Sequence, residues 1–154
     1  MPDQAPCKKC GFGWYEKDPE ARFCSRCGSP VAVAKCVLVV DDSPFVRKLV
    51  GMIITELGHR AVEAPDGVQG LSLAKAVSPD VIILDVAMPN MGGVQVLQEL
   101  RADARFKSTP VVMLTAEKGQ TTVAAVAAYG VNGYILKDQP KEMKARLQQL
   151  LNPQ

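Results

Sequence analysis

The sequence lacks the long apolar segments of membrane proteins and the leader of secreted ones. Among its 154 residues no apolar run approaches the ~18 residues that cross a bilayer. The N-terminal residues MPDQAPCKKC have no apolar core of the kind a signal peptide needs. We therefore expect a cytoplasmic protein, with room for one ordinary domain and a small appendage.

Histidine and clustered positive charge are also scarce. The single histidine, His59, follows Gly58 at an expected helix-to-strand turn. A surface position is expected there, and chemistry that needs a histidine base is poorly supported. The 18 basic and 16 acidic residues are spread evenly and give a net charge of +2. A typical nucleic-acid-binding protein would show a clustered basic surface, so this class is not favoured.

Cysteine is confined almost entirely to the first 27 residues, where four of the five cysteines form the pairs CKKC and CSRC. Two such pairs can converge on one tetrahedral ion, because each C-x-x-C wraps a tight turn around the metal. The pattern predicts a closed structural zinc site, with iron as the alternative and disulfides improbable in a cytosolic chain. The four ligands would be Cys7, Cys10, Cys24 and Cys27.

The cysteine pairs define the expected domain organisation. Over about the first 30 residues the C-x-x-C-G pattern resembles a zinc ribbon, which would stabilise a fold rather than perform chemistry. We expect the ribbon at residues 1–30, a short linker at 31–35 and the main domain at 36–154. The remaining thiol, Cys36, is expected to be buried and to pack as a small hydrophobic side chain.

From Cys36 onward, short aliphatic segments alternate with helical patterns. Ser43 and Pro44 are typical of an N-cap and a first helical residue, Pro140 is expected to open a later helix, and Gly130 is a plausible helix stop. Five strands alternating with five helices predict a parallel sheet covered on both faces. The expected strands are 37–40, 60–64, 81–84, 111–114 and 133–136.

Polar side chains stand at the ends of four of these strands: Asp41 and Asp42, Asp85, Thr115, and Lys137. In an open parallel sheet, ligands bind beyond the carboxyl ends of the strands, so these groups should converge on one pocket. Crowded carboxylates repel one another, and a hard divalent ion such as Mg²⁺ removes that conflict. The lysine and the threonine would then favour an anion with several oxygens, which a phosphoryl group satisfies.

Residues 36–154 resemble the receiver domain of two-component response regulators, particularly the stand-alone receivers of chemotaxis. The shared motifs are the acidic pair Asp41 and Asp42, LDVAMPNMGG around Asp85, MLTA with Thr115, and GYILK with Lys137. The resemblance implies an α/β fold with a five-stranded parallel sheet, doubly wound as in flavodoxin, of strand order 2-1-3-4-5. Here the small zinc-ribbon module would precede it.

The resemblance also implies a phosphorelay function. Asp85 would accept a phosphoryl group from a histidine kinase or a phosphotransfer protein, forming an aspartyl phosphate. Lys137 would pair with Asp85 and then with the phosphoryl oxygens, and Thr115 would move to hydrogen-bond the phosphoryl group. The protein would not be an enzyme beyond its own phosphorylation and dephosphorylation.

The same resemblance assigns a metal site to the acidic residues. Asp42, Asp85 and the backbone carbonyl of Ala87 would bind Mg²⁺ directly, and Asp41 would act mainly through water. Mg²⁺ and Zn²⁺ are therefore the expected cofactors of the two parts of the chain.

Tyr134 occupies the position of the aromatic switch residue, three residues before Lys137. Its rotation would remodel the face formed by the fourth helix, the fifth strand and the fifth helix, where a downstream protein effector would bind. Because the sequence ends just after the last expected helix, we expect a single-receiver protein whose output is protein binding.

Two departures and two alternative functions accompany the resemblance. Asp138 stands where the family usually has a cis proline, and Gly92 stands where an acidic residue is common. One alternative is a Mg²⁺-dependent phosphatase with an aspartate nucleophile, which would place the nucleophile after the first strand, commonly as D-x-D rather than DDSP. The other is nucleic-acid binding through the ribbon, although acidic residues balance its basic ones.

Overall fold

The computed structural model describes residue 27, residues 34–116, residue 124 and residues 126–152. The predicted zinc ribbon at residues 1–30 lies outside these residues except for Cys27, and residues 31–33 of the predicted linker also lie outside them. No helix among the described residues is both long and apolar enough to cross a bilayer.

The described residues form the predicted parallel sheet, with strand order β2-β1-β3-β4-β5. All neighbouring strands pair in parallel, as the alternation of strands and helices requires. Each predicted strand is confirmed to within one residue at either end. The strands are β1 (Cys36–Val40), β2 (Arg60–Ala64), β3 (Val81–Asp85), β4 (Val111–Thr115) and β5 (Gly133–Leu136).

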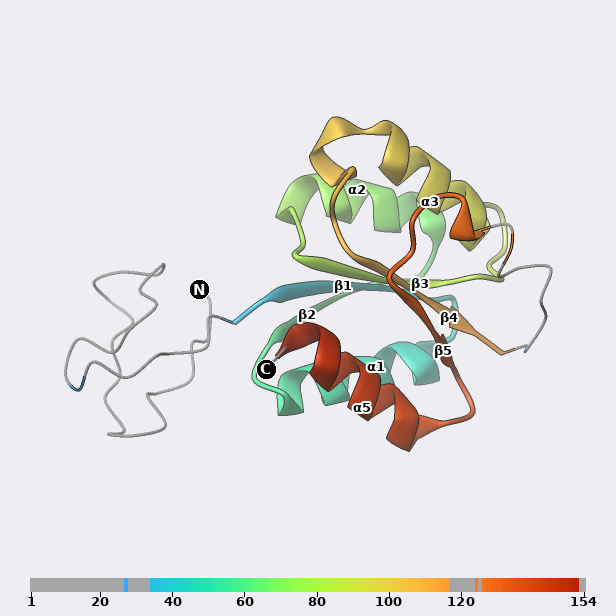
Figure 1. Cartoon of the computed structure of the whole chain (residues 1–154). Coiled ribbons are helices and arrows are strands. Elements are labelled where there is room, and N and C mark those ends of the chain that lie inside the picture. Colours follow the sequence, from blue (N-terminus) through green and yellow to red (C-terminus); the bar gives the residue numbers. More distant parts are fainter. Residues whose placement is uncertain (1–26, 28–33, 117–123, 125, 153–154) are drawn as a thin grey trace.

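Helices cover both faces of the sheet. Figure 1 shows α1 and α5 on one face and α2 and α3 on the other. Most of the helix expected between β4 and β5 lies outside the described residues, but Ala124, Val126 and Ala127 are helical. The described helices are α1 (Pro44–Glu56), α2 (Gly67–Val77), α3 (Gly93–Ala102), the short 3₁₀ helix η1 (Ala104–Phe106) and α5 (Pro140–Leu151).

Residues alternate between two cores because successive strand side chains point to opposite faces. Val37 and Val39 pack on the side of α1 and α5, whereas Leu38 and Val40 pack on the side of α2 and α3. All four are at most 1% exposed. Burial on both faces explains why the strands are continuous apolar segments rather than alternating ones.

Local sequence signals set the helix ends. The Ser43 side chain accepts the Val46 N–H and Pro44 stands in the first turn of α1, as predicted. Pro140 similarly begins α5, whose apolar stripe packs on the α1 side of the core. Gly130 has a φ of +70°, the left-handed conformation that a glycine stop allows.

Two predictions about side-chain exposure were wrong. His59 is only 7% exposed, because its ring is enclosed by the chain entering β1 and by the end of α5, to which it is hydrogen-bonded. Cys36 is half-buried rather than buried, because it is the first residue of β1 and lies at the amino edge of the sheet. Burial still raises the pKa of its thiol, against the nearby Arg60 charge.

Candidate functional site

Three carboxylates meet at the carboxyl edge of the sheet. Asp41 and Asp42 follow β1, and Asp85 is the last residue of β3, the strand beside it. One oxygen from each carboxylate lies within 4.8 Å of the others. Asp41 is 0% and Asp85 is 2% exposed, whereas Asp42 faces solvent. The predicted convergence of the three groups is therefore observed.

Lys137 brings one positive charge into this cluster from the end of β5. Its Nζ atom lies 2.8 Å from Asp41 Oδ2 and 3.0 Å from Asp85 Oδ1. Burial lowers the pKa of Lys137, but the hydrogen bonds and negative charges of the two carboxylates outweigh burial, and the net pKa is raised. The sequence predicted the contact with Asp85; the contact with Asp41 is new.

Asp85 is the least satisfied member of the cluster. Its Oδ1 atom accepts the Ala87 N–H at 3.3 Å in addition to its ion pair with Lys137. Its Oδ2 atom is buried, and no hydrogen bond reaches it from the described residues. The pKa of Asp85 is raised to about 6, chiefly by burial; Lys137 acts to lower the pKa, and Asp41 and Asp42 act to raise it.

The donor set fits a hard divalent cation. Three carboxylates and one ammonium leave an excess of negative charge, and a buried carboxylate oxygen without a partner is costly. Mg²⁺ prefers carboxylate, carbonyl and water oxygens, and usually binds through one or two carboxylates. The three carboxylates of Asp41, Asp42 and Asp85 are therefore suitable ligands for such an ion.

The remaining predicted site residues surround this cluster. Ala87 is exposed in the loop after Asp85 and holds that carboxylate through its backbone N–H. Thr115 ends β4, half-buried, and its carbonyl accepts the Lys137 N–H at 2.9 Å. Tyr134 lies opposite Met113 in the β4–β5 pair and packs on the α2–α3 side of the core, where burial raises the pKa of its phenol.

Two residues that support the cluster were missed from the sequence. Arg47, in α1, donates a hydrogen bond from Nη1 to the Asp41 carbonyl at 2.6 Å. Gly93 begins α3 directly against the end of β3, and a Cβ there would collide with the Asp85 carbonyl oxygen. The adjacent pair Gly92 and Gly93 was a signal for such a close approach. An arginine four residues after a helix cap carried no comparable signal.

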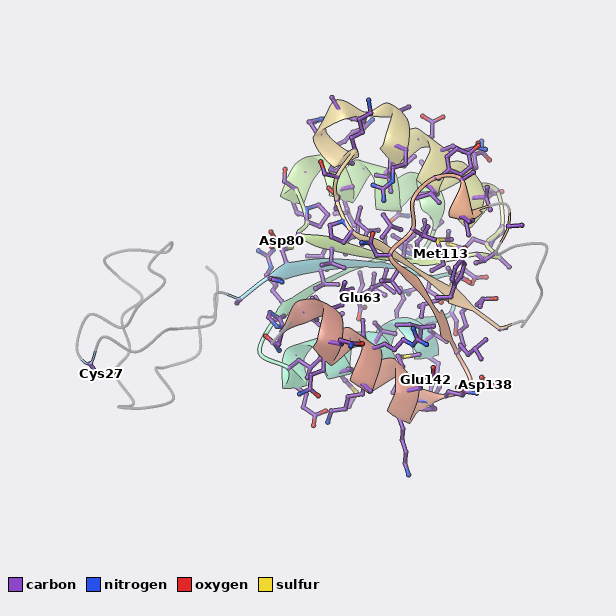
Figure 2. The ribbon with its side chains drawn as sticks, in the orientation of Figure 1. Cys27, Glu63, Asp80, Met113, Asp138 and Glu142 are labelled. Carbon is purple, nitrogen blue, oxygen red and sulfur yellow. The ribbon has the colours of Figure 1, made fainter. Side chains whose placement is uncertain are left out.

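Asp138, which stands where the family usually has a cis proline, follows an ordinary trans peptide bond. The described residues contain no cis peptide bond, so the Lys137–Asp138 bond is trans. Figure 2 shows Asp138 beyond the end of β5 and Asp80 at the opposite end of the sheet. Asp138 is exposed and lies outside the group formed by Asp41, Asp42 and Asp85.

The fold and the acidic edge together define a receiver domain. Residues 37–148 match the Response regulator receiver domain family, and the chain belongs to that family. Receiver domains bind Mg²⁺ at an acidic pocket, which is formed here by Asp41, Asp42 and Asp85. Mg²⁺-dependent acceptance of a phosphoryl group on an aspartate is general for the family.

The most similar relatives include chemotaxis proteins. The chain is 38% identical over 102 residues to chemotaxis protein CheY-3 of Vibrio cholerae, covering 66% of this chain and 78% of that protein. It is 36% identical over 118 residues to a chemotaxis protein CheY homolog of Campylobacter jejuni, and the match covers 75% of this chain and 91% of that protein.

Solved structures agree in fold. Chemotaxis protein CheY4 of Vibrio cholerae aligns with a TM-score of 0.71 at 33% identity, covering 77% of this chain and 98% of that chain. The Mn²⁺-bound form of response regulator Rcp1 aligns with a TM-score of 0.70 at 25% identity, covering 78% and 96%.

Proposed function

We propose that this protein is a phosphorelay receiver in which Asp85 accepts a phosphoryl group from a histidine kinase or a phosphotransfer protein. The observation that carries the proposal is the buried Asp85 Oδ2 atom, which no hydrogen bond occupies, beside a carboxylate-bound lysine. A carboxylate oxygen held in place but left without a donor is available as a nucleophile.

The transfer step exchanges one bond to phosphorus for another. Asp85 Oδ2 attacks the phosphorus of a phosphohistidine, a P–O bond forms as the P–N bond breaks, and the departing imidazole nitrogen keeps the electron pair. Lys137, which contacts Asp85 Oδ1, stabilises the negative charge that the phosphoryl oxygens bring. Thr115, at the end of β4, then hydrogen-bonds a phosphoryl oxygen.

The acidic cluster holds the cofactor in this proposal. Asp42, Asp85 and the backbone carbonyl of Ala87 would hold Mg²⁺ directly, and Asp41 would act through water, with its ion pair to Lys137 retained. When bound, the ion offsets the mutual repulsion of the carboxylates and of the incoming phosphoryl oxygens. The existence of a Mn²⁺-bound form of response regulator Rcp1, a structural relative, supports a divalent cation as the cofactor.

The output of the proposed receiver is a change of protein-binding surface. Tyr134, half-buried against the core in β5, rotates as Thr115 moves toward the phosphoryl group. That rotation alters the face formed by the segment before β5, β5 itself and α5, which binds a downstream protein effector. The likeness to chemotaxis proteins supports this form of output, in the cytoplasm.

Phosphorylation by acetyl phosphate tests the proposal directly. Intact-mass spectrometry of the full chain should show slow, stoichiometric, Mg²⁺-dependent addition of one phosphoryl group. The addition should be lost in Asp85→Asn and retained in Asp138→Asn, the matched control, because Asp138 is an exposed aspartate at the same edge. Labelling of Asp85→Asn at the wild-type rate would exclude Asp85 as the acceptor.

The same assay separates the phosphatase alternative. A phosphatase of this chemistry would turn over many small phosphoesters through a nucleophile after β1, where this chain has Asp41 and Asp42. Asp41 is poorly suited to that role, because Ser43 N–H at 2.8 Å and the Lys137 ammonium occupy its two oxygens. Rapid multiple turnover would favour the phosphatase instead.

We further propose that residues 1–30 bind one structural zinc ion, that residues 31–35 form a linker and that residues 36–154 form the receiver. The support is the paired C-x-x-C-G sequence at Cys7, Cys10, Cys24 and Cys27. Elemental analysis should find one zinc per chain, lost on Cys7→Ser with Cys10→Ser and retained in Cys36→Ser. Iron in place of zinc, or binding of nucleic acid at physiological salt, would refute this assignment of the segment.

A further inference from the structure

Arg47 makes a contact with the acidic pair that none of the expected functions required. It lies in the first turn and a half of α1, half-buried, and its Nη1 atom donates to the backbone carbonyl of Asp41 at 2.6 Å. A charged donor on a neutral carbonyl makes a short and strong hydrogen bond.

This carbonyl completes the fixation of Asp41. The Asp41 N–H donates to Ala64 O at 3.2 Å, Oδ1 accepts the Ser43 N–H at 2.8 Å, and Oδ2 pairs with Lys137 at 2.8 Å. The remaining polar atom of Asp41 is the oxygen that Arg47 binds. That oxygen belongs to the peptide unit joining Asp41 to Asp42, so Arg47 restrains the rotation of this unit.

The orientation of this peptide unit matters for Asp42 more than for Asp41. Asp41 is buried and held on all sides, whereas Asp42 faces solvent and pairs with no basic side chain among the described residues; its carboxylate hydrogen-bonds to Asp85, another acid of the same cluster. The direction of the Asp42 side chain therefore depends on its backbone. If the backbone of a metal ligand is not held in place, the ligand loses conformational freedom when the metal binds, and this entropy cost weakens the affinity for the metal.

The contact is geometric rather than a means of charge compensation. Among the described residues, the ion pairs of the buried carboxylates Asp41 and Asp85 are made with Lys137. Among the described residues, the pKa of Asp85 responds to burial, Lys137, Asp41 and Asp42, and Arg47 is not one of the groups that shift it. Its guanidinium reaches the neutral backbone instead.

We propose that Arg47 is a positioning residue for the cation site, which fixes the Asp41–Asp42 peptide unit so that the Asp42 carboxylate is already directed toward the ion. This inference rests on the proposed function, because it concerns the same Mg²⁺ site. It adds a residue from the first turns of α1 to a site otherwise built from strand ends.

Positioning and charge predict opposite results when Arg47 is replaced. Removing a positive charge near a cation site should tighten cation binding, since like charges repel. Removing a positioning donor should weaken binding, by about 10-fold or more as for other groups that orient metal ligands. The variant Arg47→Met keeps much of the aliphatic stem and removes both charge and donor, so the direction of the change decides between the two.

The experiment measures Mn²⁺ and Mg²⁺ affinity of the full chain by calorimetry for the wild type and three variants. Arg47→Met should bind about 10-fold more weakly. Lys48→Met, the matched control, removes the neighbouring exposed charge of α1 and should leave affinity unchanged or slightly tighter. Arg47→Lys, which can still donate to the carbonyl, should recover part of the loss.

A metal-independent readout and a kinetic one accompany the affinities. Without metal, the Asp42 and Ser43 amides should exchange with solvent faster in Arg47→Met, while amides in β3 and β4 keep their protection. With acetyl phosphate, the metal concentration for half-maximal labelling should rise about 10-fold, and the rate at saturating metal should stay within about twofold of wild type.

Each outcome decides the proposal. Unchanged or tighter binding in Arg47→Met overturns it, as does a labelling defect that saturating metal does not correct. If Arg47→Met fails to fold, the metal affinity of the more conservative variant Arg47→Lys is compared with that of the wild type instead. Failure of the wild type to bind metal, or to be labelled at Asp85, would instead overturn the proposed function.

Discussion

The two edges of the sheet hold their polar groups in different ways. At the amino edge, where β1 and β3 begin, buried and half-buried polar groups are paired. At the carboxyl edge, like charges are crowded and Asp85 Oδ2 has no partner among the described residues. Because both edges belong to the same strands of one sheet, the difference does not come from the fold itself.

The amino edge is closed by hydrogen bonds between distant segments. His59 Nδ1 accepts the Lys35 N–H at 3.0 Å, and His59 Nε2 lies 3.2 Å from Asn152 Oδ1. Asp80 accepts the Cys36 N–H at 2.8 Å and returns its own N–H to the Cys36 carbonyl at 2.8 Å. These bonds satisfy the backbone where the chain enters the sheet.

Arg101 makes the densest set of contacts at the same edge. Its guanidinium donates to five backbone carbonyls and thereby joins the end of α3 to the segments before β4 and β5. The acceptors are Phe106 O at 2.7 Å, Lys107 O at 3.4 Å, Thr109 O at 2.8 Å, Tyr129 O at 2.9 Å and Gly130 O at 3.1 Å.

The comparison separates stability from function along one sheet. Satisfied polar groups stabilise a fold, and unsatisfied ones persist where a ligand completes them. Variants of the amino edge should therefore change the free energy of unfolding and spare phosphorylation. Variants of the carboxyl edge should do the reverse.

The largest effect on stability is expected for Arg101→Met. The change leaves five carbonyls without their charged donor, and the free energy of unfolding should fall by about 2–4 kcal/mol. Urea unfolding measures this loss, and labelling by acetyl phosphate should stay within about twofold at a temperature where the variant is folded.

Arg105→Met is the matched control for this prediction. Arg105 lies on the same edge but is exposed, and its partner is the neighbouring Asp103 at 2.7 Å. Its replacement should change stability little, since exposed ion pairs contribute little. If both variants lost the same amount of unfolding free energy, the hydrogen bonds from Arg101 to the five carbonyls would not be the cause of its contribution to stability.

A smaller, pH-dependent effect is expected at His59. Burial lowers its pKa below the ordinary 6.5; Lys35 lowers it further, while Asn152 and Asp80 oppose the shift. The contribution of the neutral ring is therefore complete above pH 6.5 and is lost as the pH falls below it. Protonation removes the acceptor for the Lys35 N–H, because both ring nitrogens then carry protons.

The comparison with His59→Phe isolates this titration, because His59 is the only histidine of the chain. Above pH 7 the wild type should be more stable by about 1 kcal/mol, the value of a typical buried hydrogen bond. The difference should shrink steadily in urea unfolding as the pH falls below 6.5. A difference independent of pH would mean that His59 contributes by packing alone.

Sequence reasoning succeeded where the determinants are local or are imposed by topology. Ser43 and Pro44 predict the start of α1 because they are its N-cap and first residue. The alternation of side chains along β1 determines which of the two cores each residue enters. Asp41 and Asp85 could be placed together although 44 residues separate them, because parallel strands bring their carboxyl ends to one edge.

The missed features depend on side chains that reach segments fixed only by the finished fold. His59 was expected at the surface because it follows Gly58 at a helix-to-strand turn, but its hydrogen-bond partners lie 24 and 93 residues away. In the sequence, Arg101 is indistinguishable from any arginine near the end of a helix. Its most distant hydrogen-bond acceptor in the structure is 29 residues away. Neither periodicity nor spacing encodes which carbonyls such a side chain meets.

The smallest effect on the metal-free protein is expected for Asp42→Ala, which tests the carboxyl edge. Asp42 faces solvent beside two buried carboxylates, so removing its charge should change the metal-free free energy of unfolding by less than about 0.5 kcal/mol. Mg²⁺ at ten times its dissociation constant should stabilise the wild type by about 1.4 kcal/mol, since only the folded state binds it.

That stabilisation should disappear in Asp42→Ala, together with most labelling by acetyl phosphate, while Asp138→Ala retains both. Urea unfolding with and without Mg²⁺ measures the two quantities in one experiment. Arg101→Met should show the converse behaviour, with low metal-free stability and a full Mg²⁺ increment. If Asp42→Ala instead kept its Mg²⁺ increment, the ion would not depend on this carboxylate, and the excess negative charge at the carboxyl edge would need another explanation.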